Sequence, residues 1–227
     1  MLQKDKMDIK KLIKGKVDKF NKQGYIHLKN VIKPPLLSHT RYQSIALAKH
    51  YRQFEGQPRD NGTGIFWKGL EMASTLQPML FESYTHEDMF HIAQAFLGVD
   101  EPYLYNDQVV VKFPLDEFTF EPHYDNEYGP NKEGALKGEF KTINCCQILT
   151  NMPIKSGPLR CYNNETQQYD VLPAKAGDIV VIDGNTLHSS THNLSDKVRA
   201  LYACVYSSHP IGDHMQGFYN EKFKTPA

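Results

Sequence analysis

The residues best suited to chemistry are two histidines and one aspartate. The chain contains His123-Tyr124-Asp125, and His188 follows much later. Side chains two apart on a β-strand point to the same face, so His123 and Asp125 can converge on one point. Two imidazoles and one carboxylate leave coordination positions open, and this ligand set is typical of non-heme Fe(II). The three residues therefore predict an iron site.

The His-x-Asp pair alone is weak evidence. The chain has 10 His and 26 Asp plus Glu, so a surface histidine beside an aspartate is the plainer interpretation when nothing else supports a site. Glycine-rich phosphate loops, GxSxG and HExxH are all missing, which removes the commoner nucleotide, acyl-transfer and metalloprotease interpretations.

The elements that must hold these ligands lie in the second half of the chain. Short runs rich in β-branched and aromatic residues are separated by Gly, Pro and Asn, and they predict strands at 103–113, 142–150, 157–162, 169–172, 178–183 and 198–207. This pattern is typical of an antiparallel sandwich or jelly roll. The strand at 178–183 leads the chain toward His188.

The first half is predicted to be mainly helical. Apolar residues at three- and four-residue intervals predict helices over about 7–22, 37–54 and 85–97, with a strand at 25–32 and a loop at 55–64. Gly24 and Gly98 are expected to end two of the helices, and Thr85 with Asp88 resembles a capping box. We expect one domain, with a helical layer at 1–100, a β core at 101–210 and a tail at 211–227.

The charge and the cysteine content of the chain limit the partners and the location that we expect. Lys plus Arg and Asp plus Glu are both 26, so the formal net charge is zero. Without a basic excess, neither nucleic acid nor an anionic membrane is an expected partner. The four cysteines form no CxxC pair and no apolar leader is visible, so we expect reduced thiols and a cytoplasmic location. We also expect a monomer or a homodimer.

Several segments together resemble the phytanoyl-CoA dioxygenase-like branch of the Fe(II)/2-oxoglutarate-dependent oxygenases. The matching residues are Phe20 to Ile26, Val111-Lys112-Phe113-Pro114, His123-Tyr124-Asp125, Gly157-Pro158-Leu159, Gly177-Asp178, His188, Ser190, Asn193 and Arg199. The resemblance implies an α+β fold, with a double-stranded β-helix (jelly roll, cupin-like) core and N-terminal helices packed on one face.

The resemblance also implies a role for each residue. His123, Asp125 and His188 would bind Fe(II), and Arg199 would bind the distal carboxylate of the cosubstrate 2-oxoglutarate. Ser190 would add a hydroxyl donor and Lys112 a further contact. The activity implied is hydroxylation of an unactivated C–H in a small molecule with O₂, releasing succinate and CO₂. Asp125 favours hydroxylation, because halogenating relatives replace this carboxylate, while desaturation and ring closure stay open.

Two departures from the family pattern concern the walls of the site. Cys146 stands where some members have an aromatic residue facing 2-oxoglutarate, and 163–166 replaces the usual proline-glycine-serine-histidine stretch. Candidate substrate contacts are Tyr124, Asn126, Tyr128, Arg160 and Trp67, although an outward, solvated Arg160 is the plainer interpretation. A lid, if present, is expected from 55–80 and the C-terminus.

Two other functions fit the same sequence. One is a peptide or protein hydroxylase, which would need an exposed groove. The other is a non-catalytic jelly roll that holds a metal and a ligand. Because a binding module has no need of a 2-oxoglutarate clamp, Arg199 and Ser190 together favour the small-molecule enzyme.

Overall fold

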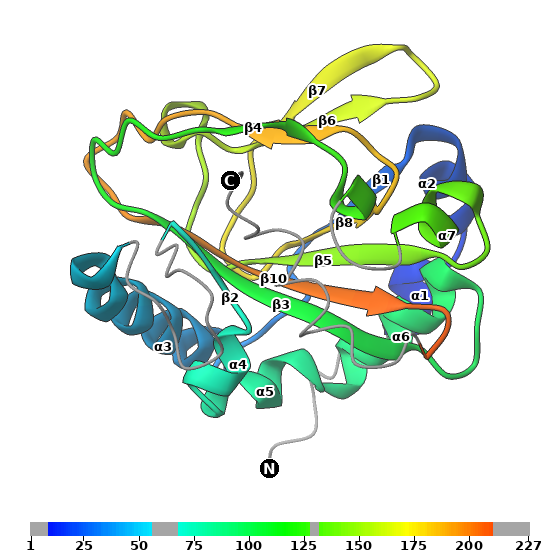
Figure 1. The fold of residues 1–227 in the computed structure, drawn as a ribbon, viewed down its shortest axis with the longest axis horizontal. Helices are drawn as coiled ribbons and strands as arrows, with labels where there is room; N and C mark the ends of the chain where they lie inside the picture. The colour runs from blue at the N-terminus through cyan, green and yellow to red at the C-terminus, as the bar shows by residue number, and fades with distance from the viewer. Residues whose placement is uncertain (1–8, 56–67, 128–131, 211–227) are drawn as a thin grey trace, which may run out of the picture.

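Two antiparallel sheets face each other in the computed structural model, which describes residues 9–55, 68–127 and 132–210 (Figure 1). The larger sheet has the order β1-β8-β5-β10-β3-β2 and the smaller has β4-β9-β6-β7. The strands are β1 (Tyr25–Leu28), β2 (Gly69–Glu71), β3 (Tyr103–Lys112), β4 (Phe120–His123), β5 (Thr142–Ile148), β6 (Leu159–Asn163), β7 (Gln168–Leu172), β8 (Ile179–Asp183), β9 (His188–Ser190) and β10 (Arg199–Ser207).

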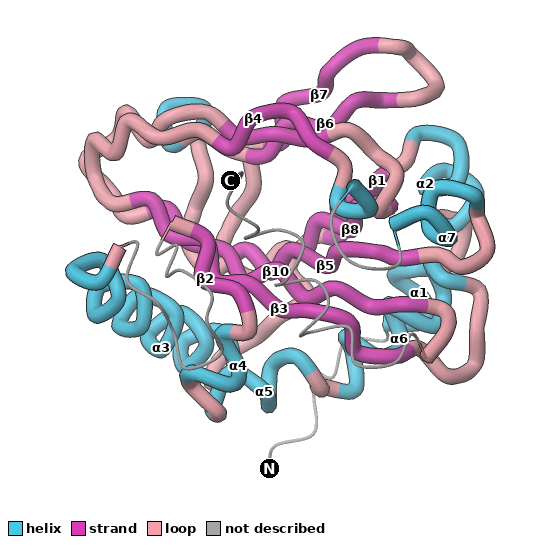
Figure 2. Tube along the Cα trace, in the orientation of Figure 1, coloured by secondary structure: helices cyan, strands magenta, loops and turns pink. Residues whose placement is uncertain are grey.

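Helices cover the outer face of the larger sheet, as Figure 2 shows, so the layers run helices, large sheet, small sheet. They are α1 (Ile9–Ile13), α2 (Val17–Gln23), α3 (Leu36–Tyr51), α4 (Ala73–Leu76), α5 (Met79–Tyr84) and α6 (Glu87–Leu97), while α7 (Lys132–Lys137) lies beside the open edge of the two sheets. The arrangement confirms the expected jelly-roll core with N-terminal helices on one face.

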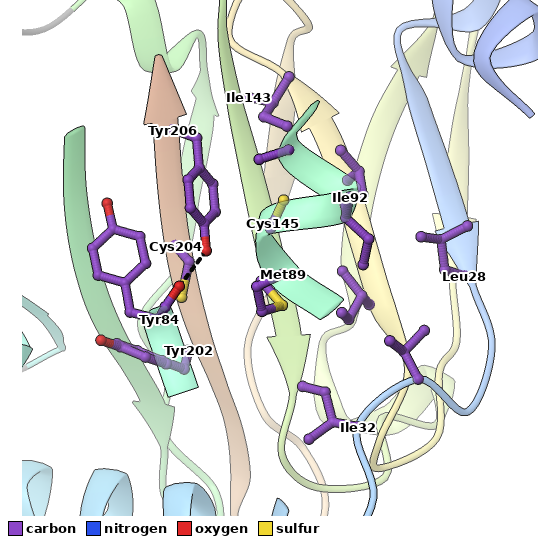
Figure 3. Packing of buried hydrophobic residues seen from close by; sticks show 14 of the residues in the cluster. Leu28, Ile32, Tyr84, Met89, Ile92, Ile143, Cys145, Tyr202, Cys204 and Tyr206 are labelled. Atoms are coloured by element: carbon purple, nitrogen blue, oxygen red, sulfur yellow. Dashed lines mark hydrogen bonds between the residues drawn. The ribbon is translucent and has the colours of Figure 1, made fainter. Parts of the chain in front are cut away.

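The strands of the larger sheet are buried on both faces, and alternation divides their side chains between two cores. Tyr202 and Cys204 of β10 pack with the helices, whereas Leu201 and Ala203 face the small sheet. Figure 3 shows the helix-side core, where the Tyr206 hydroxyl donates to the Tyr84 carbonyl oxygen at 2.5 Å. Because both faces are covered, all nine residues of β10 are buried.

The six predicted strands of the second half are all present, with ends shifted by at most two residues. The predicted strand at 25–32 is shorter, ending at Leu28. Strands β2, β4 and β9 and the helices α4, α5 and α7 were not predicted. Since β1 and β2 pair into the large sheet, residues before 100 also contribute to the β core.

Two helix predictions need correction. The helix expected over 7–22 is two helices, because Gly15 takes a positive φ of 76° after α1. Thr85 does not cap α6: its hydroxyl donates to the Phe81 carbonyl of the preceding helix, and His86 Nδ1 accepts from the Asp88 amide instead. Gly24 and Gly98 end α2 and α6 in the left-handed conformation, as expected.

All four cysteines are free and buried. Within the described ranges, no helix combines the length and the apolar character that crossing a bilayer requires. The predicted loop at 55–64 and the C-terminal part of the predicted lid fall largely outside the described residues.

Candidate metal centre

The three predicted metal ligands meet between the two sheets. One ligand atom from each of His123, Asp125 and His188 lies within 4.8 Å of the others. Asp125 Oδ1 is 3.8 Å from His123 Nε2 and 3.6 Å from His188 Nε2. Ligand atoms about 2 Å from one ion are separated by such distances, so the cluster has the size of a metal site.

Strand pairing and backbone carbonyls orient the two imidazoles. His123 at the end of β4 lies opposite His188 at the start of β9. His123 Nδ1 is 2.7 Å from the Glu121 carbonyl oxygen, and His188 Nδ1 is 3.0 Å from that of Thr186. A carbonyl only accepts, so each Nδ1 carries the proton and each Nε2 keeps its lone pair for a metal.

Asp125 reaches the site by a different route from the one predicted. Strand β4 ends at His123, and Asp125 begins a short 3₁₀ helix, Asp125–Glu127. The same-face argument for the pair was therefore wrong in its geometry, although the two side chains do converge. Asn144 of β5 donates from Nδ2 to Asp125 Oδ2 at 3.0 Å and fixes the carboxylate.

Arg199 places a buried positive charge in the site. It begins β10, is fully buried, and lines the same cavity as the three ligands. None of its three guanidinium nitrogens has a hydrogen-bond partner among the described residues. Burial lowers the pKa of Arg199 to about 10, so the group is charged at neutral pH. A buried, unpaired cation is costly, and an anion in the cavity would remove that cost.

Lys112 and Ser190 lie beside Arg199. Lys112 is the register partner of Arg199, and its Nζ donates to Ser190 Oγ at 2.9 Å and to the Thr191 carbonyl oxygen at 2.5 Å. Burial and the neighbouring Arg199 charge lower the pKa of Lys112 to about 6. Ser190 lines the cavity, whereas Lys112 does not belong to its lining.

The cavity around the three candidate ligands is narrow, and its lining combines polar and apolar residues. Its wall includes Cys146, whose thiol donates to Asn144 Oδ1 at 3.4 Å and whose pKa is raised by burial. The full lining is Gln108, Val110, Phe120, His123, Asp125, Asn144, Cys146, Leu159, His188, Ser189, Ser190, Arg199, Leu201 and Ala203. The three candidate metal ligands and the unpaired guanidinium of Arg199 thus share one cavity.

The predicted substrate contacts have mixed placements. Asn126 is buried and lines a second cavity, which adjoins the metal centre. Arg160 lies at an outward position of β6, with its guanidinium 5.1 Å from the Tyr169 ring centroid, and neither it nor Tyr124 lines these two cavities. Tyr128 and Trp67 lie outside the described residues.

Sequence reasoning missed Asn144 and Phe120. Asn144 lies two residues before Cys146 on a predicted strand, so its shared face with Cys146 could have been inferred from alternation. Phe120 lies on β4, which has no apolar run to reveal it.

The donor set fits the groups that the sequence implied. Two neutral imidazoles and a carboxylate suit Fe(II) with open positions. The unpaired guanidinium of Arg199 suits a carboxylate held by two parallel hydrogen bonds.

Comparison with known proteins agrees with this geometry. The family model described as Phytanoyl-CoA dioxygenase (PhyH) matches residues 162–201, a segment that contains His188, Ser190 and Arg199. A search of curated proteins found no match.

Several solved structures share the fold. The non-heme alpha ketoglutarate dependent carbocyclase SnoK from nogalamycin biosynthesis is 20% identical with a TM-score of 0.71, covering 88% of this chain and 85% of its own. The epimerase SnoN from the same biosynthesis is 17% identical (TM-score 0.68; coverage 96% and 91%). EctD from S. alaskensis is 16% identical (TM-score 0.70; coverage 93% and 84%).

At these identities the structures establish the fold. The family model covers residues 162–201, which is the C-terminal part of the resemblance seen in the sequence. The chain therefore combines this fold with a His-Asp-His cluster and with a segment, residues 162–201, that matches the phytanoyl-CoA dioxygenase (PhyH) family model.

Proposed function

We propose that the protein is an Fe(II)- and 2-oxoglutarate-dependent oxygenase that hydroxylates an unactivated C–H of a small molecule. The observation that carries the proposal is the position of Arg199: a buried, unpaired guanidinium in the cavity that also holds the triad. A metal-binding jelly roll without a cosubstrate would leave this charge uncompensated. Relatives of the same fold support the cofactors, since EctD has been solved with 2-oxoglutarate and 5-hydroxyectoine.

In this proposal His123, Asp125 and His188 hold the metal and Arg199 binds the distal carboxylate of 2-oxoglutarate. Bound Fe(II), 2-oxoglutarate and O₂ supply the oxidising chemistry, with release of succinate and CO₂. The Ser190 oxygen already accepts from Lys112, so its O–H is available to donate to the same carboxylate. Lys112 orients Ser190 through the hydrogen bond that its Nζ donates to Ser190 Oγ.

The test is anaerobic addition of Fe(II) and 2-oxoglutarate while the visible spectrum is recorded. Chelation of a 2-oxo acid to iron should give a charge-transfer band in the wild type. The variant Arg199→Met should bind iron as well as the wild type does, and should need at least about tenfold more 2-oxoglutarate for the band, because one bidentate ion pair is lost. Iron-loaded, folded protein without a band would refute the proposal and favour a non-catalytic binding protein.

Hydroxylation is the finer part of the proposal, and Asp125 is its support. Relatives with this fold include a carbocyclase and an epimerase, so the product must be measured. Once a substrate is found by stimulated succinate release, mass spectrometry should show one added oxygen atom derived from O₂. A product that has lost hydrogen without gaining oxygen would identify desaturation or ring closure instead.

A further inference from the structure

The carboxylate of the triad is carried by a short segment that is bound to a distant part of the chain. Asp125 begins the 3₁₀ helix Asp125–Glu127 and lies outside the paired strands. The next backbone amide, that of Asn126, donates to the Gly184 carbonyl oxygen at 3.1 Å. Gly184 lies in the turn between β8 and β9, which leads directly to His188. The backbone beside one ligand is therefore bound to the turn that precedes another.

The side chain of Asn126 makes two more connections at the same place. It is 5% exposed, its Oδ1 accepts from the Thr142 hydroxyl at 2.6 Å, and its Nδ2 donates to Asn185 Oδ1 at 2.9 Å. Thr142 begins β5, and its carbonyl oxygen accepts from the Gly184 amide at 3.0 Å. Because both ends of the amide are engaged between β5 and the β8–β9 turn, Asn126 fits a positioning role better than the substrate contact expected from the sequence.

The contact between Asn126 and the turn is tightly packed. A Cβ on Gly184 would lie 2.0 Å from Thr142 Oγ1, 2.7 Å from Asn126 Oδ1 and 2.8 Å from Asn126 Nδ2. Each of these distances is below the 3.0 Å that real Cβ atoms keep from their neighbours. The absence of a side chain at Gly184 therefore lets the asparagine amide lie directly against the backbone of the turn.

The same turn also orients one of the imidazoles. Thr186 is 1% exposed, and its hydroxyl donates to the Gly24 carbonyl oxygen at 2.9 Å. Its own carbonyl oxygen is 3.0 Å from His188 Nδ1. Gly24 ends α2, so the turn is itself bound to the chain between α2 and β1. Residues 184–186 therefore support two of the three candidate ligands, one through Asn126 and one through the Thr186 carbonyl.

We propose that Asn126 is a positioning residue for Asp125, and that the turn at 184–186 is the common support that sets Asp125 and His188 relative to each other. The inference rests on the proposed function and adds to it the residues that keep two ligands at the separation one ion requires. Asn126 is not itself a ligand and acts through its backbone and the turn. Such supporting residues influence metal affinity, because a displaced ligand must be brought back before the ion can bind it.

The test is anaerobic titration with Fe(II), together with the visible spectrum of the Co(II)-loaded protein as a probe of ligand geometry. In Asn126→Leu the Kd for Fe(II) should rise at least about tenfold. The Co(II) spectrum should also change, because the carboxylate no longer keeps its place. Asn163→Leu, a change at a buried asparagine of β6 that donates to Asp170, is the matched control and should keep the wild-type affinity and spectrum. An unchanged affinity or an unchanged spectrum in Asn126→Leu would overturn the inference.

A second variant removes the contact from the side of the turn. Asn185 is exposed, so Asn185→Ala is expected to fold even if Asn126→Leu does not. It removes the acceptor of Asn126 Nδ2 and should raise the Kd for Fe(II) at least about threefold. Asn164→Ala, at an exposed asparagine between β6 and β7, is its control and should bind iron as the wild type does.

The double variant Asn126→Leu/Asn185→Ala examines whether the two residues act as one contact. It should bind iron no more weakly than Asn126→Leu alone, because the first change already removes the hydrogen bond that the two residues share. Fully additive losses, or a wild-type affinity in Asn185→Ala, would contradict the proposed link to the turn.

The wild type separates the two possible failures. If folded wild type binds neither Fe(II) nor Co(II), the proposed function fails and this inference fails with it. If the wild type binds iron and gives the charge-transfer band with 2-oxoglutarate, and the variants equal the wild type, only the positioning role of Asn126 fails.

Discussion

At the scale of single residues, the site depends on side chains that hold other side chains. Asn144 holds Asp125, and two backbone carbonyls hold the imidazole rings. Partners of this kind commonly change metal affinity by 10- to 100-fold when they are lost. The iron affinity of this protein should therefore depend on residues that do not touch the metal.

Replacing Asn144 with leucine tests this dependence. Asn144→Leu keeps the approximate volume and removes the donor to Asp125, so the Kd for Fe(II) should rise at least about tenfold. Anaerobic titration with Fe(II) measures it. Asn163→Leu is the control, because Asn163 is similarly buried and donates to Asp170. If the two variants bind iron equally well, Asn144 does not position Asp125.

Lys112 predicts a pH dependence of stability. Its folded pKa, about 6, lies below the ordinary lysine value of about 10.4. Between these values the folded state binds fewer protons than the unfolded state, so the free energy of unfolding rises with pH across that window. Below pH 6 both states are protonated and the contribution is constant.

The comparison is with Lys112→Met, which cannot titrate at this position. As pH rises from about 6.5 to 9, the difference in unfolding free energy should shift in favour of the wild type, by at most about 1.4 kcal/mol per pH unit. Urea unfolding of both proteins across this range gives the difference, in which groups common to both cancel. Parallel curves would contradict the depressed pKa.

At the scale of elements, the turn before β6 is packed against the segment that follows Ser190. Gly157 has a φ of +65°, and a Cβ there would overlap the carbonyl oxygens of Thr191 and His192. The Thr191 oxygen also accepts from Lys112. The absence of a side chain at Gly157 therefore sets the position of backbone next to the expected cosubstrate end of the site.

Gly157→Ala should destabilise the protein by at least about 2 kcal/mol, from the positive φ together with the backbone overlap. Gly98→Ala is the matched control, since Gly98 also has a positive φ but nothing would lie within 4 Å of its Cβ. It should cost only about 1 kcal/mol. Urea unfolding distinguishes the two, and 2-oxoglutarate affinity should fall only for Gly157→Ala. Equal losses in both variants would show that the overlap is relieved without cost.

The elements also show what a sequence can and cannot predict. Strand β8 is a β-branched apolar run, and β10 is rich in apolar and aromatic residues; both are buried on both faces, so their local pattern predicts them. Strand β4 contains Glu121 and Pro122, and β9 consists of His188 and two serines. These two strands are far apart in the sequence and pair with each other, and the local hydrophobic periodicity of the sequence does not indicate such a pairing.

The same reasoning explains the site residues. The triad was predicted from residue types and family motifs, although the strands that carry the histidines were not. The outward placement of Arg160, the plainer interpretation from the sequence, follows from alternation, because its neighbours Leu159 and Cys161 are apolar and point inward. The place of Glu71 in the adjoining cavity could not have been predicted, since it depends on a three-residue strand pairing with β3.

At the scale of the whole molecule, the metal centre joins the two sheets. His123 and His188 belong to the small sheet, whereas Arg199 and Asn144 belong to the large one. The small sheet therefore contributes the imidazoles and the large sheet contributes the cation and the amide. Ligands bound between the sheets are expected to stabilise the fold as a unit, because an unfolded chain cannot assemble groups so far apart in sequence.

Fe(II) and 2-oxoglutarate together should raise the unfolding temperature by mass action. A ligand present at 100 times its Kd and bound only by the folded state adds about 2.7 kcal/mol, which corresponds to roughly 5–10 °C for a chain of this size. Anaerobic thermal unfolding with Fe(II) alone, 2-oxoglutarate alone and both measures the coupling. The increment from 2-oxoglutarate should require the metal and should largely disappear in Arg199→Met, while the increment from iron remains. An increment from 2-oxoglutarate that is equal with and without iron would place its binding away from the triad.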